Sequence, residues 1–411
     1  METALTRTFS SLKVRNFRLF MTGQAISMCG TWMQTIAISW LVLEISHSGT
    51  ILGLSVAAQY LPILLFGAFG GVIADRFNKR KILFFTQSSL AILAAILSVI
   101  ALTHHDNLDI IFVICALLGC VQVVDTPTRQ SFVSEMVGQD NVRNAVTLNS
   151  TMVNVARIIG PSIGGIIIAT VSIGMCFLVN ALSFVAVIVA LALMRTSELT
   201  LVKTSSREPG QLRAGIKYVL SDPRLSTTLL MMFIIGTFAY EFPVIFPLFA
   251  THVLHGHAST YSSLMVATGI GAIAGGLYSA GHSIKKESQL MWIAFAFGVS
   301  IILTSIMPTY FLVLAFLVPM GALSVLFIAL GNSTLQLTAS PSMRGRVMSL
   351  WVVAFAGTTP IGGPLVGWIS DHSSPRVAMA IGGVSAIVAA ILAHLIYTRS
   401  TAKLSRSAAG H

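Results

Sequence analysis

The sequence predicts an all-α membrane protein whose twelve transmembrane helices form two pseudo-symmetric bundles of six. Of its 411 residues, 55% are apolar and only 9% are charged, against about 25% charged in an ordinary soluble domain. The apolar residues gather in runs long enough to cross a bilayer. Because a helix satisfies its own backbone hydrogen bonds in hydrocarbon, each run is predicted to be a transmembrane helix.

Twelve apolar runs alternate with polar connections along the chain. They cover residues 19–43, 50–74, 82–103, 109–127, 145–170, 173–194, 225–250, 260–280, 289–307, 311–338, 347–370 and 377–397. Several contain Gly or Pro, which transmembrane helices tolerate. We therefore expect a multi-pass protein of the cytoplasmic (inner) cell membrane.

The positive charges predict the orientation. The formal net charge is +11, and all but two of the 25 Lys and Arg residues lie near the termini or in connections that share one side. The exceptions are Arg376, in a connection on the opposite side, and Arg157, inside a run. Because basic residues accumulate on the cytoplasmic side, both termini are predicted to be cytoplasmic. The charge follows the membrane edges and forms no basic patch interleaved with aromatic residues, so nucleic acid is not an expected partner.

A long polar connection, from Arg195 to Arg224, separates the first six runs from the last six. The predicted parts are an N-terminal bundle (residues 1–195), a cytoplasmic linker (196–223) and a C-terminal bundle with a tail (224–411). One helical face of the linker is predicted to be apolar, through Leu212, Ile216, Val219 and Leu220. This pattern indicates a short amphipathic helix on the cytoplasmic membrane surface.

The two sets of six runs carry related sequences. The segment from Gly70-Gly71 to Arg80-Lys81 is matched, at the same spacing, by the segment from Gly275-Gly276 to Lys285-Lys286. A second match, Ile163-Gly164-Gly165 with Ile361-Gly362-Gly363, falls in the fifth run of each set. Parallel six-helix repeats are typical of transporters, with a substrate site near the midplane between the repeats.

The connection between the second and third runs carries the most specific motif, Gly71-x-x-x-Asp75-Arg76-x-Asn78-Lys79-Arg80-Lys81. A glycine lets a helix approach its neighbour closely. Asp75 can accept hydrogen bonds from a facing helix N-terminus, that of the eleventh run near Arg346, and so latch the bundles in one state. A cytoplasmic anchor alone would account for the basic residues Arg76, Arg80 and Lys81, but not for the Gly and Asp.

A second motif lies in the fifth run, Gly160-Pro161-Ser162-Ile163-Gly164-Gly165. A proline kinks a helix, and glycines give it a face without side chains. The fifth helix is therefore predicted to be kinked and closely packed on its neighbours.

Both motifs resemble those of the major facilitator superfamily. The first has the form of its signature loop, with Asn78 in place of a Gly and Lys79 in place of an Arg. The second is similar to the core of its antiporter motif, although Ala156 occupies an upstream Gly position. The resemblance implies the twelve-helix fold. The antiporter motif also implies export, because in this superfamily it marks exporters.

One branch of the superfamily is the most similar, that of enterobactin-type siderophore exporters and macrolide efflux proteins, the transmembrane secretion effectors. The resemblance extends from Asn16-Phe17-Arg18 to Arg344-Gly345-Arg346-Val347 and includes residues 125–130 and 157–161. Drug exporters usually carry an Arg four residues before a Gly in the fourth helix. Here Cys115 stands in that place before Gly119.

Ionisable residues inside apolar runs are costly and are candidates for the transport mechanism. Glu241, in the seventh run, can carry a coupling proton; alternatively it lies near the outer rim in ordinary contact with water. Asp125 and Arg129 are four residues apart and can form an ion pair on one helix face. Arg157 either lines the cavity or has a structural role, bound to Asp125 or to helix carbonyls.

Polar and aromatic stripes outline the predicted substrate cavity, which suits bulky amphipathic compounds. For each residue, packing between helices is the alternative. The candidates are Gln24, Thr31, Gln34, Asn154, Phe233, Tyr240, Asn332, Gln336, Trp351 and Phe355.

The sequence does not predict an enzyme. It lacks the HExxH, GxxxxGK[ST] and GxSxG motifs, which carry zinc, phosphate and acyl-transfer chemistry, and no cofactor is expected. His252, His255 and His257 have a spacing that could bind a metal. The alternative is an outer connection that avoids Lys and Arg and uses His for polarity, and the expected site contains no metal.

The expected function is secondary active export of a small amphipathic organic molecule, a drug or a siderophore-like metabolite, by alternating access in exchange for protons. We expect a monomer in the lipid bilayer. The alternatives are a solute uptake symporter and a lipid or lysolipid flippase of the same fold. A membrane-embedded enzyme is the least favoured interpretation.

Overall fold

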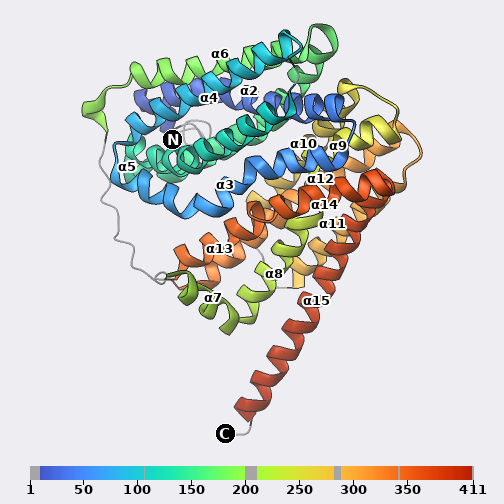
Figure 1. Ribbon diagram of the computed structural model, residues 1–411. Helices are drawn as coiled ribbons and strands as arrows, with labels where there is room; N and C mark the ends of the chain where they lie inside the picture. Colours follow the sequence, from blue (N-terminus) through green and yellow to red (C-terminus); the bar gives the residue numbers. More distant parts are fainter. Residues whose placement is uncertain (1–9, 106, 200–210, 282–287, 341–342, 410–411) are drawn as a thin grey trace. The chain divides into compact units, whose positions relative to one another are not determined.

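The computed structural model describes residues 10–105, 107–199, 211–281, 288–340 and 343–409, which are almost entirely helical (Figure 1). Twelve segments of this described chain are long and apolar enough to cross a membrane. The predicted all-α protein with twelve membrane-spanning segments is therefore confirmed. The cytoplasmic location of both termini stays a prediction.

The helices of the first half begin with a short 3-10 helix and include one very long α-helix. They are η1 (Ser10–Lys13), α2 (Arg15–Ser46), α3 (Gly49–Arg76), α4 (Lys79–Leu102), α5 (Leu108–Thr170), α6 (Ile173–Ala192) and the 3-10 helix η2 (Thr196–Glu198). The fourth span (Leu108–Gly138) and the fifth (Asn144–Thr170) both lie in α5, and the φ of +67° at Gly138 interrupts the helix at the end of the fourth. Glycine adopts this left-handed conformation without steric cost.

The second half contains more and shorter helices. They are α7 (Gln211–Ser221), α8 (Pro223–Phe238), α9 (Phe242–Leu248), the π-helix η3 (Phe249–Val253), α10 (Ala258–Gly281), α11 (Ser288–Ile306), α12 (Tyr310–Thr338), α13 (Arg344–Ala356), α14 (Thr359–His372) and α15 (Pro375–Ala409).

Two compact units make up the described chain. The first comprises the described residues of Met1–His47, Ala58–Ser205 and His257–Val266; the second comprises those of Ser48–Ala57, Ser206–Gly256 and Ala267–His411. The start of α3 thus belongs to the second unit and the start of α10 to the first. The division of the sequence into bundles at residues 195 and 224 stays a prediction.

Polar residues in the short connections begin several helices. Asn78, Asn107 and Ser172 are the N-caps of α4, α5 and α6, and each side chain accepts a hydrogen bond from a backbone N–H of the first turn. Such caps satisfy donors that have no partner within the helix. These three capping residues therefore help to fix where α4, α5 and α6 begin.

The seventh and eleventh runs, each predicted as one helix, are interrupted in the structure. Residues 239–241 separate α8 from α9, and residues 357–358 separate α13 from α14. Pro243 and Pro360 lie in the first turns that follow the breaks. Proline has no backbone N–H, and its ring clashes with the carbonyl four residues before it, so each break has a local cause. In membrane proteins, broken helices often form substrate and ion sites.

The repeated Gly-Gly pair has the same packing role in each unit. A methyl group at Gly70 in α3 would overlap the carbonyl oxygen of Val123 in α5, and one at Gly275 in α10 would overlap that of Ala322 in α12. Each glycine thus allows two backbones to meet without a side chain between them. The end of the second repeat, Lys285-Lys286, lies outside the described residues.

The linker contains a helix, α7, at the predicted place, and the apolar residues of its predicted face differ in exposure. Gly215 and Val219 are buried, and Gly215 faces α13. Ile216 and Leu220 are exposed. The phenol oxygen of Tyr218 accepts a hydrogen bond from a backbone N–H of the chain before α13 (3.1 Å). Val219 thus packs within the second unit, and the location of α7 on the cytoplasmic membrane surface stays a prediction.

Candidate functional site

The loop between α3 and α4 is bound into the first unit by its basic residues. The ammonium of Lys79 lies 2.6 Å from a carboxylate oxygen of Glu135 in α5, and both side chains are buried. Arg80 donates to the carbonyls of Leu191 (2.8 Å) and Ala192 (3.2 Å) at the end of α6. Basic groups at a helix C-terminus satisfy its free carbonyls and its dipole. These contacts go beyond a simple electrostatic anchor.

The other residues of this motif lie at the junction itself. Gly71 and Asp75 are half-buried, Arg76 is exposed at the end of α3, and Lys81 is exposed in the first turn of α4. The backbone N–H of Lys81 donates to the cap Asn78 (3.1 Å). The role of Asp75 as a latch stays a prediction.

The glycines of the fifth-span motif allow close helix contacts in the first unit. Gly160 and Gly164 in α5 face α2, where an added methyl group would press on a backbone carbonyl or a methionine side chain. Gly165 faces Ser262 of α10. The Ser262 hydroxyl donates to the carbonyl of Pro161 (2.5 Å). The motif therefore joins α5 closely to two other helices.

Asp125 is the centre of a buried polar group in the first unit. Its Oδ1 accepts hydrogen bonds from the Thr86 hydroxyl (2.7 Å) and the Gln87 amide (2.9 Å), both in α4. Its Oδ2 lies 3.9 Å from Nε of Arg129. The pairing predicted from the four-residue spacing is thus present, and α4 supplies the stronger contacts. Hydrogen bonds such as these offset the cost of burying a polar group.

Arg157, also in the first unit, stacks on an aromatic ring of α2. Its guanidinium carbon lies 4.9 Å from the ring centre of Trp32, a favourable cation–π distance. Asn154, predicted one turn away, has a side chain outside the described residues. The choice between a cavity-lining and a structural role for Arg157 stays open.

Glu241 occupies the break between α8 and α9 and is 2% exposed. Neither carboxylate oxygen makes a hydrogen bond of normal geometry with the described residues, although the Thr359 side chain in α14 is within interaction range. A methyl group at Gly362 would lie 2.7 Å from Oε1. The carboxylate therefore approaches the first turn of α14. Its burial does not fit the alternative of a residue in ordinary contact with water.

Aromatic rings gather beside Glu241 in the second unit. The Tyr240 ring centre is 5.4 Å from that of Phe297, 5.5 Å from that of Phe355 and 5.8 Å from that of Phe242. Its hydroxyl donates to the carbonyl of Ser324 in α12 (2.8 Å). These spacings are typical of packed aromatic pairs. Two of the predicted cavity residues, Tyr240 and Phe355, are thus in contact.

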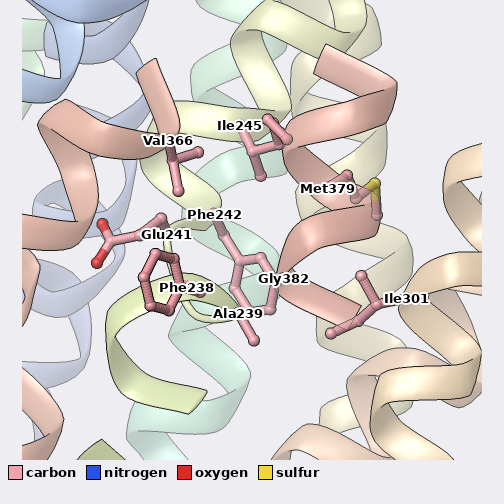
Figure 2. Close-up of a pocket in the computed structure, with 10 residues that line it drawn as sticks. Phe238, Ala239, Glu241, Phe242, Ile245, Ile301, Val366, Met379 and Gly382 are labelled. Carbon is pink, nitrogen blue, oxygen red and sulfur yellow. The ribbon is translucent and has the colours of Figure 1, made fainter. Parts of the chain in front are cut away.

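A small, mainly apolar cavity lies between α8, α9, α11, α14 and α15 (Figure 2). Figure 2 shows the Glu241 carboxylate directed away from Phe242, Ile301 and Met379. The lining residues are Phe238, Ala239, Glu241, Phe242, Ile245, Ile301, Val366, Ala378, Met379 and Gly382. The cavity borders the backbone of residues 239–241, between α8 and α9. The Glu241 carboxylate points away from the cavity.

The predicted cavity residues of α2 mostly make contacts within the first unit. The Gln34 amide oxygen accepts a hydrogen bond from Asn180 of α6 (2.6 Å). Thr31 donates to the carbonyl of Ser27 (2.9 Å). Gln24 is buried, and its amide oxygen receives no hydrogen bond from the described residues. For Gln34, the packing alternative describes the observed contact.

The predicted residues of the other helices differ in exposure. Phe233 in α8 is exposed and Trp351 in α13 is buried, with its ring against Gly331 of α12. The Gln336 amide donates to the Asn332 side chain, as expected for residues four apart on α12. Trp351 therefore also packs between helices.

The three histidines of the predicted outer connection are described by the structure. No group of three or more His, Cys, Asp or Glu side chains in the described ranges is placed to hold a metal ion. His252 Nδ1 lies 3.1 Å from the Thr251 hydroxyl and 3.3 Å from the carbonyl of Leu248, while His255 has a left-handed φ of 49°. His257 precedes α10. The observed contacts fit the interpretation of a polar connection.

Sequence reasoning missed two carboxylates that make strong contacts, Glu135 and Asp371. Glu135 binds Lys79 from α5, a partner far away in sequence. Asp371, at the end of α14, accepts hydrogen bonds from the start of α3. The sequence does show that each is an acidic residue shortly after an apolar run, which could have marked it as a candidate. The partners could not be inferred without the helix arrangement.

Comparison with known proteins identifies the family. Residues 6–410 match the family described as transmembrane secretion effector. The chain is 24% identical over 394 residues to the staphyloferrin A transporter of Staphylococcus aureus, covering 95% of this chain and 98% of that one. It is also 24% identical over 385 residues to the enterobactin exporter EntS of Shigella flexneri, covering 92% and 91% of the two chains.

A solved structure supports the fold. The crystal structure of a POT family transporter in complex with a thioalcohol-conjugated peptide has a TM-score of 0.75 at 13% identity, covering 94% of this chain and 96% of that one. The predicted superfamily, branch and multi-pass cell-membrane location are thereby confirmed. The chain belongs to the transmembrane secretion effector family of the major facilitator superfamily, whose members are membrane transporters and not enzymes.

Proposed function

We propose that the protein exports a small amphipathic organic molecule from the cell by alternating access, driven by protons that move in the opposite direction. Both termini are cytoplasmic in this proposal, in line with the distribution of Lys and Arg. The observation that carries the proposal is Glu241, a carboxylate that is 2% exposed at a break in the seventh span.

Protonation of Glu241 can be coupled to helix movement because of its surroundings. Burial disfavours the anionic form of Glu241, whereas the nearby first turn of α14, at Thr359 and Gly362, attracts it, since helix N-termini favour negative charge. As a neutral acid it loses this attraction. A proton that binds and leaves therefore changes how firmly the α8–α9 break is held to α14. The same charge change alters the environment of any substrate that contacts the neighbouring rings.

Export and the substrate class are supported by three features. The Gly160-Pro161-x-x-Gly164-Gly165 motif packs α5 against α2 and α10, and in the superfamily this motif resembles that of exporters. One relative is an enterobactin exporter. The Tyr240 aromatic group and the Arg157–Trp32 pair offer surfaces for an amphipathic, partly charged molecule. A siderophore-like metabolite or a drug has that chemistry.

Compound profiling tests the function directly. The chain would be expressed in an efflux-deficient bacterial host, and growth tolerance and exported compounds would be compared with those of a vector control. We expect tolerance to rise for selected amphipathic compounds, which then accumulate in inside-out vesicles. Accumulation in right-side-out vesicles would instead establish uptake. Movement of labelled lipid between leaflets without either result would establish a flippase.

Coupling would be tested with purified protein in proteoliposomes. A pH-sensitive dye inside the vesicles would report proton flux driven by a gradient of the compound found in the profile. We expect Glu241→Gln to abolish most of the flux, because the amide cannot release a proton. Glu44→Gln is the matched control, since Glu44 is an exposed carboxylate in α2. Parental flux in Glu241→Gln would exclude this residue as the proton carrier.

A further inference from the structure

The carboxylate of Asp371 binds the first turn of α3 through four donors. Oδ1 accepts from the backbone N–H of Gly49 (2.6 Å), and Oδ2 accepts from the N–H of Thr50 and from the hydroxyls of Thr50 and Ser48 (2.8 Å each). The Ser48 hydroxyl also lies 3.4 Å from the N–H of Ile51. Asp371 is thus a cap for a helix to which it does not belong. Such charged hydrogen bonds are stronger than neutral ones.

Below this cap, α3 and α14 meet along glycines. Gly49 and Gly53 in α3 are four residues apart, as are Gly363 and Gly367 in α14, and Gly49 faces Gly367 while Gly53 faces Gly363. A methyl group at Gly53 would overlap the carbonyl of its partner. Two facing small-xxx-small patterns allow helix backbones to touch. Asp371 is the next residue of this row in α14, again four positions further on.

The contact involves only the start of α3. Ser48–Ala57 belongs to the second unit with α14, whereas α3 from Ala58 onward belongs to the first unit. The corresponding start of α10, within His257–Val266, belongs to the first unit, where Ser262 donates to Pro161 of α5. The hydrogen bond between Ser262 in α10 and Pro161 in α5 joins two neutral groups. A charged cap therefore distinguishes the α3–α14 contact.

The groups of this contact can be separated at modest cost. Asp371 is exposed, and three of its four hydrogen bonds lie at the surface. When the helices part, water can bind both the carboxylate and the freed N–H groups, so no polar group is left buried without a partner. Along the glycine row the two backbones meet directly, at Gly53 with Gly363 and at Gly49 with Gly367. Both properties suit a contact that forms and breaks repeatedly.

We propose that Asp371 is a releasable latch that holds the start of α3 against α14 when the outer side of the transporter is closed. Its release lets the two helices separate and opens the outer side. The inference rests on the proposed function for the outer location of this end and for the existence of an open state. It does not depend on Glu241 or on the identity of the substrate.

A reporter cysteine tests the latch without a substrate. In a variant whose four native cysteines are replaced by alanine, Ala57→Cys places a thiol two turns below Asp371's contacts, in line with Gly49 and Gly53. Ala57 is buried, so fraying of the first turn alone would not expose it. A membrane-impermeant maleimide is added to intact cells, and the labelling rate of the thiol is measured.

We expect Asp371→Asn to raise the labelling rate about ten-fold, the effect of losing roughly one charged hydrogen bond net. Ser48→Ala/Thr50→Val removes two of the donors and leaves α14 untouched, so a smaller rise is expected. The matched control is Asp109→Asn, which changes an exposed aspartate in the first turn of α5 and should not alter the rate.

Parental labelling in Asp371→Asn and in Ser48→Ala/Thr50→Val would overturn the latch. If Asp371→Asn does not accumulate in the membrane, the Ser48→Ala/Thr50→Val result decides alone. Labelling only in inside-out vesicles would overturn the outer assignment. Because labelling needs no transport, a failed latch together with confirmed compound export, or the reverse, separates this inference from the proposed function.

Discussion

The buried ion pair of Lys79 and Glu135 allows a quantitative test of how the loop between α3 and α4 is bound to α5. The two charged atoms are 2.6 Å apart, and the side chains are 8% and 7% exposed. Removing one partner of a buried pair costs about 3–5 kcal/mol, because the other charge remains buried. Lys79 begins α4, so its ammonium can turn toward the helix end and reach water. We therefore expect Glu135→Gln to lower the free energy of unfolding by about 3 kcal/mol, the low end of this range.

Thermal unfolding of the purified protein in detergent measures this effect. At about 2 °C per kcal/mol for a large domain, Glu135→Gln should lower the Tm by about 6 °C. The double variant Lys79→Met/Glu135→Leu should recover most of this loss, since apolar residues of similar size often replace buried ion pairs without cost. The matched control is Glu198→Gln, which breaks the exposed Arg195–Glu198 pair (3.1 Å); a shift below about 1 °C is expected.

Two outcomes would refute this reasoning. An unchanged Tm in Glu135→Gln would show that the pair is not energetically coupled to folding. A double variant less stable than the single variant would show that the ion pair itself contributes a large net stabilisation. In that case desolvation does not offset the attraction between the charges at this site.

Two further predictions concern packing and helix ends. Gly70→Ala should sharply reduce the yield of folded protein, because its methyl group would overlap the Val123 backbone. Gly67→Ala, in the same helix, is the control: the nearest atom to its methyl group is 4.0 Å away, so it should be tolerated. Size-exclusion profiles of the two variants check this. Arg376→Ala should lower the Tm by a few degrees. Arg376 donates to two carbonyls at the end of α11 (2.5 and 2.9 Å), and without the guanidinium these acceptors are unsatisfied. A Tm equal to that of the parent would contradict this prediction.

The sequence predicts the spans well because their signal is local. Long apolar runs, the linker and the repeated Gly-Gly pairs all follow from composition and spacing. Glu241 could be found because a charge inside an apolar run stands out. The break beside it had a local signal too, Pro243, which cannot continue the hydrogen bonds of a helix, although the run was predicted as continuous.

Pairings between helices could not be predicted in the same way. Gln34 was expected at the cavity, and it binds Asn180 of α6. Asp125 was expected to pair with Arg129, and its shorter contacts are with Thr86 and Gln87. In each case the polar residue type was informative. The partner depends on how helices are rotated and stacked, which apolar periodicity does not specify when every face of a helix is hydrophobic.

The glycine contacts separate two tasks that proteins often assign to the same residues. Helix spacing at Gly70, Gly160 and Gly363 is set by backbone meeting backbone or by one short neighbour. The rings around Tyr240 lie elsewhere and pack through their side chains, not through backbone contact. Under the proposed function, in which these rings contact the substrate, we expect substitutions among them to change which molecule is accepted more than they change the spacing at the glycines. Proteins of this fold can therefore differ in substrate while they keep the same glycine contacts between helices.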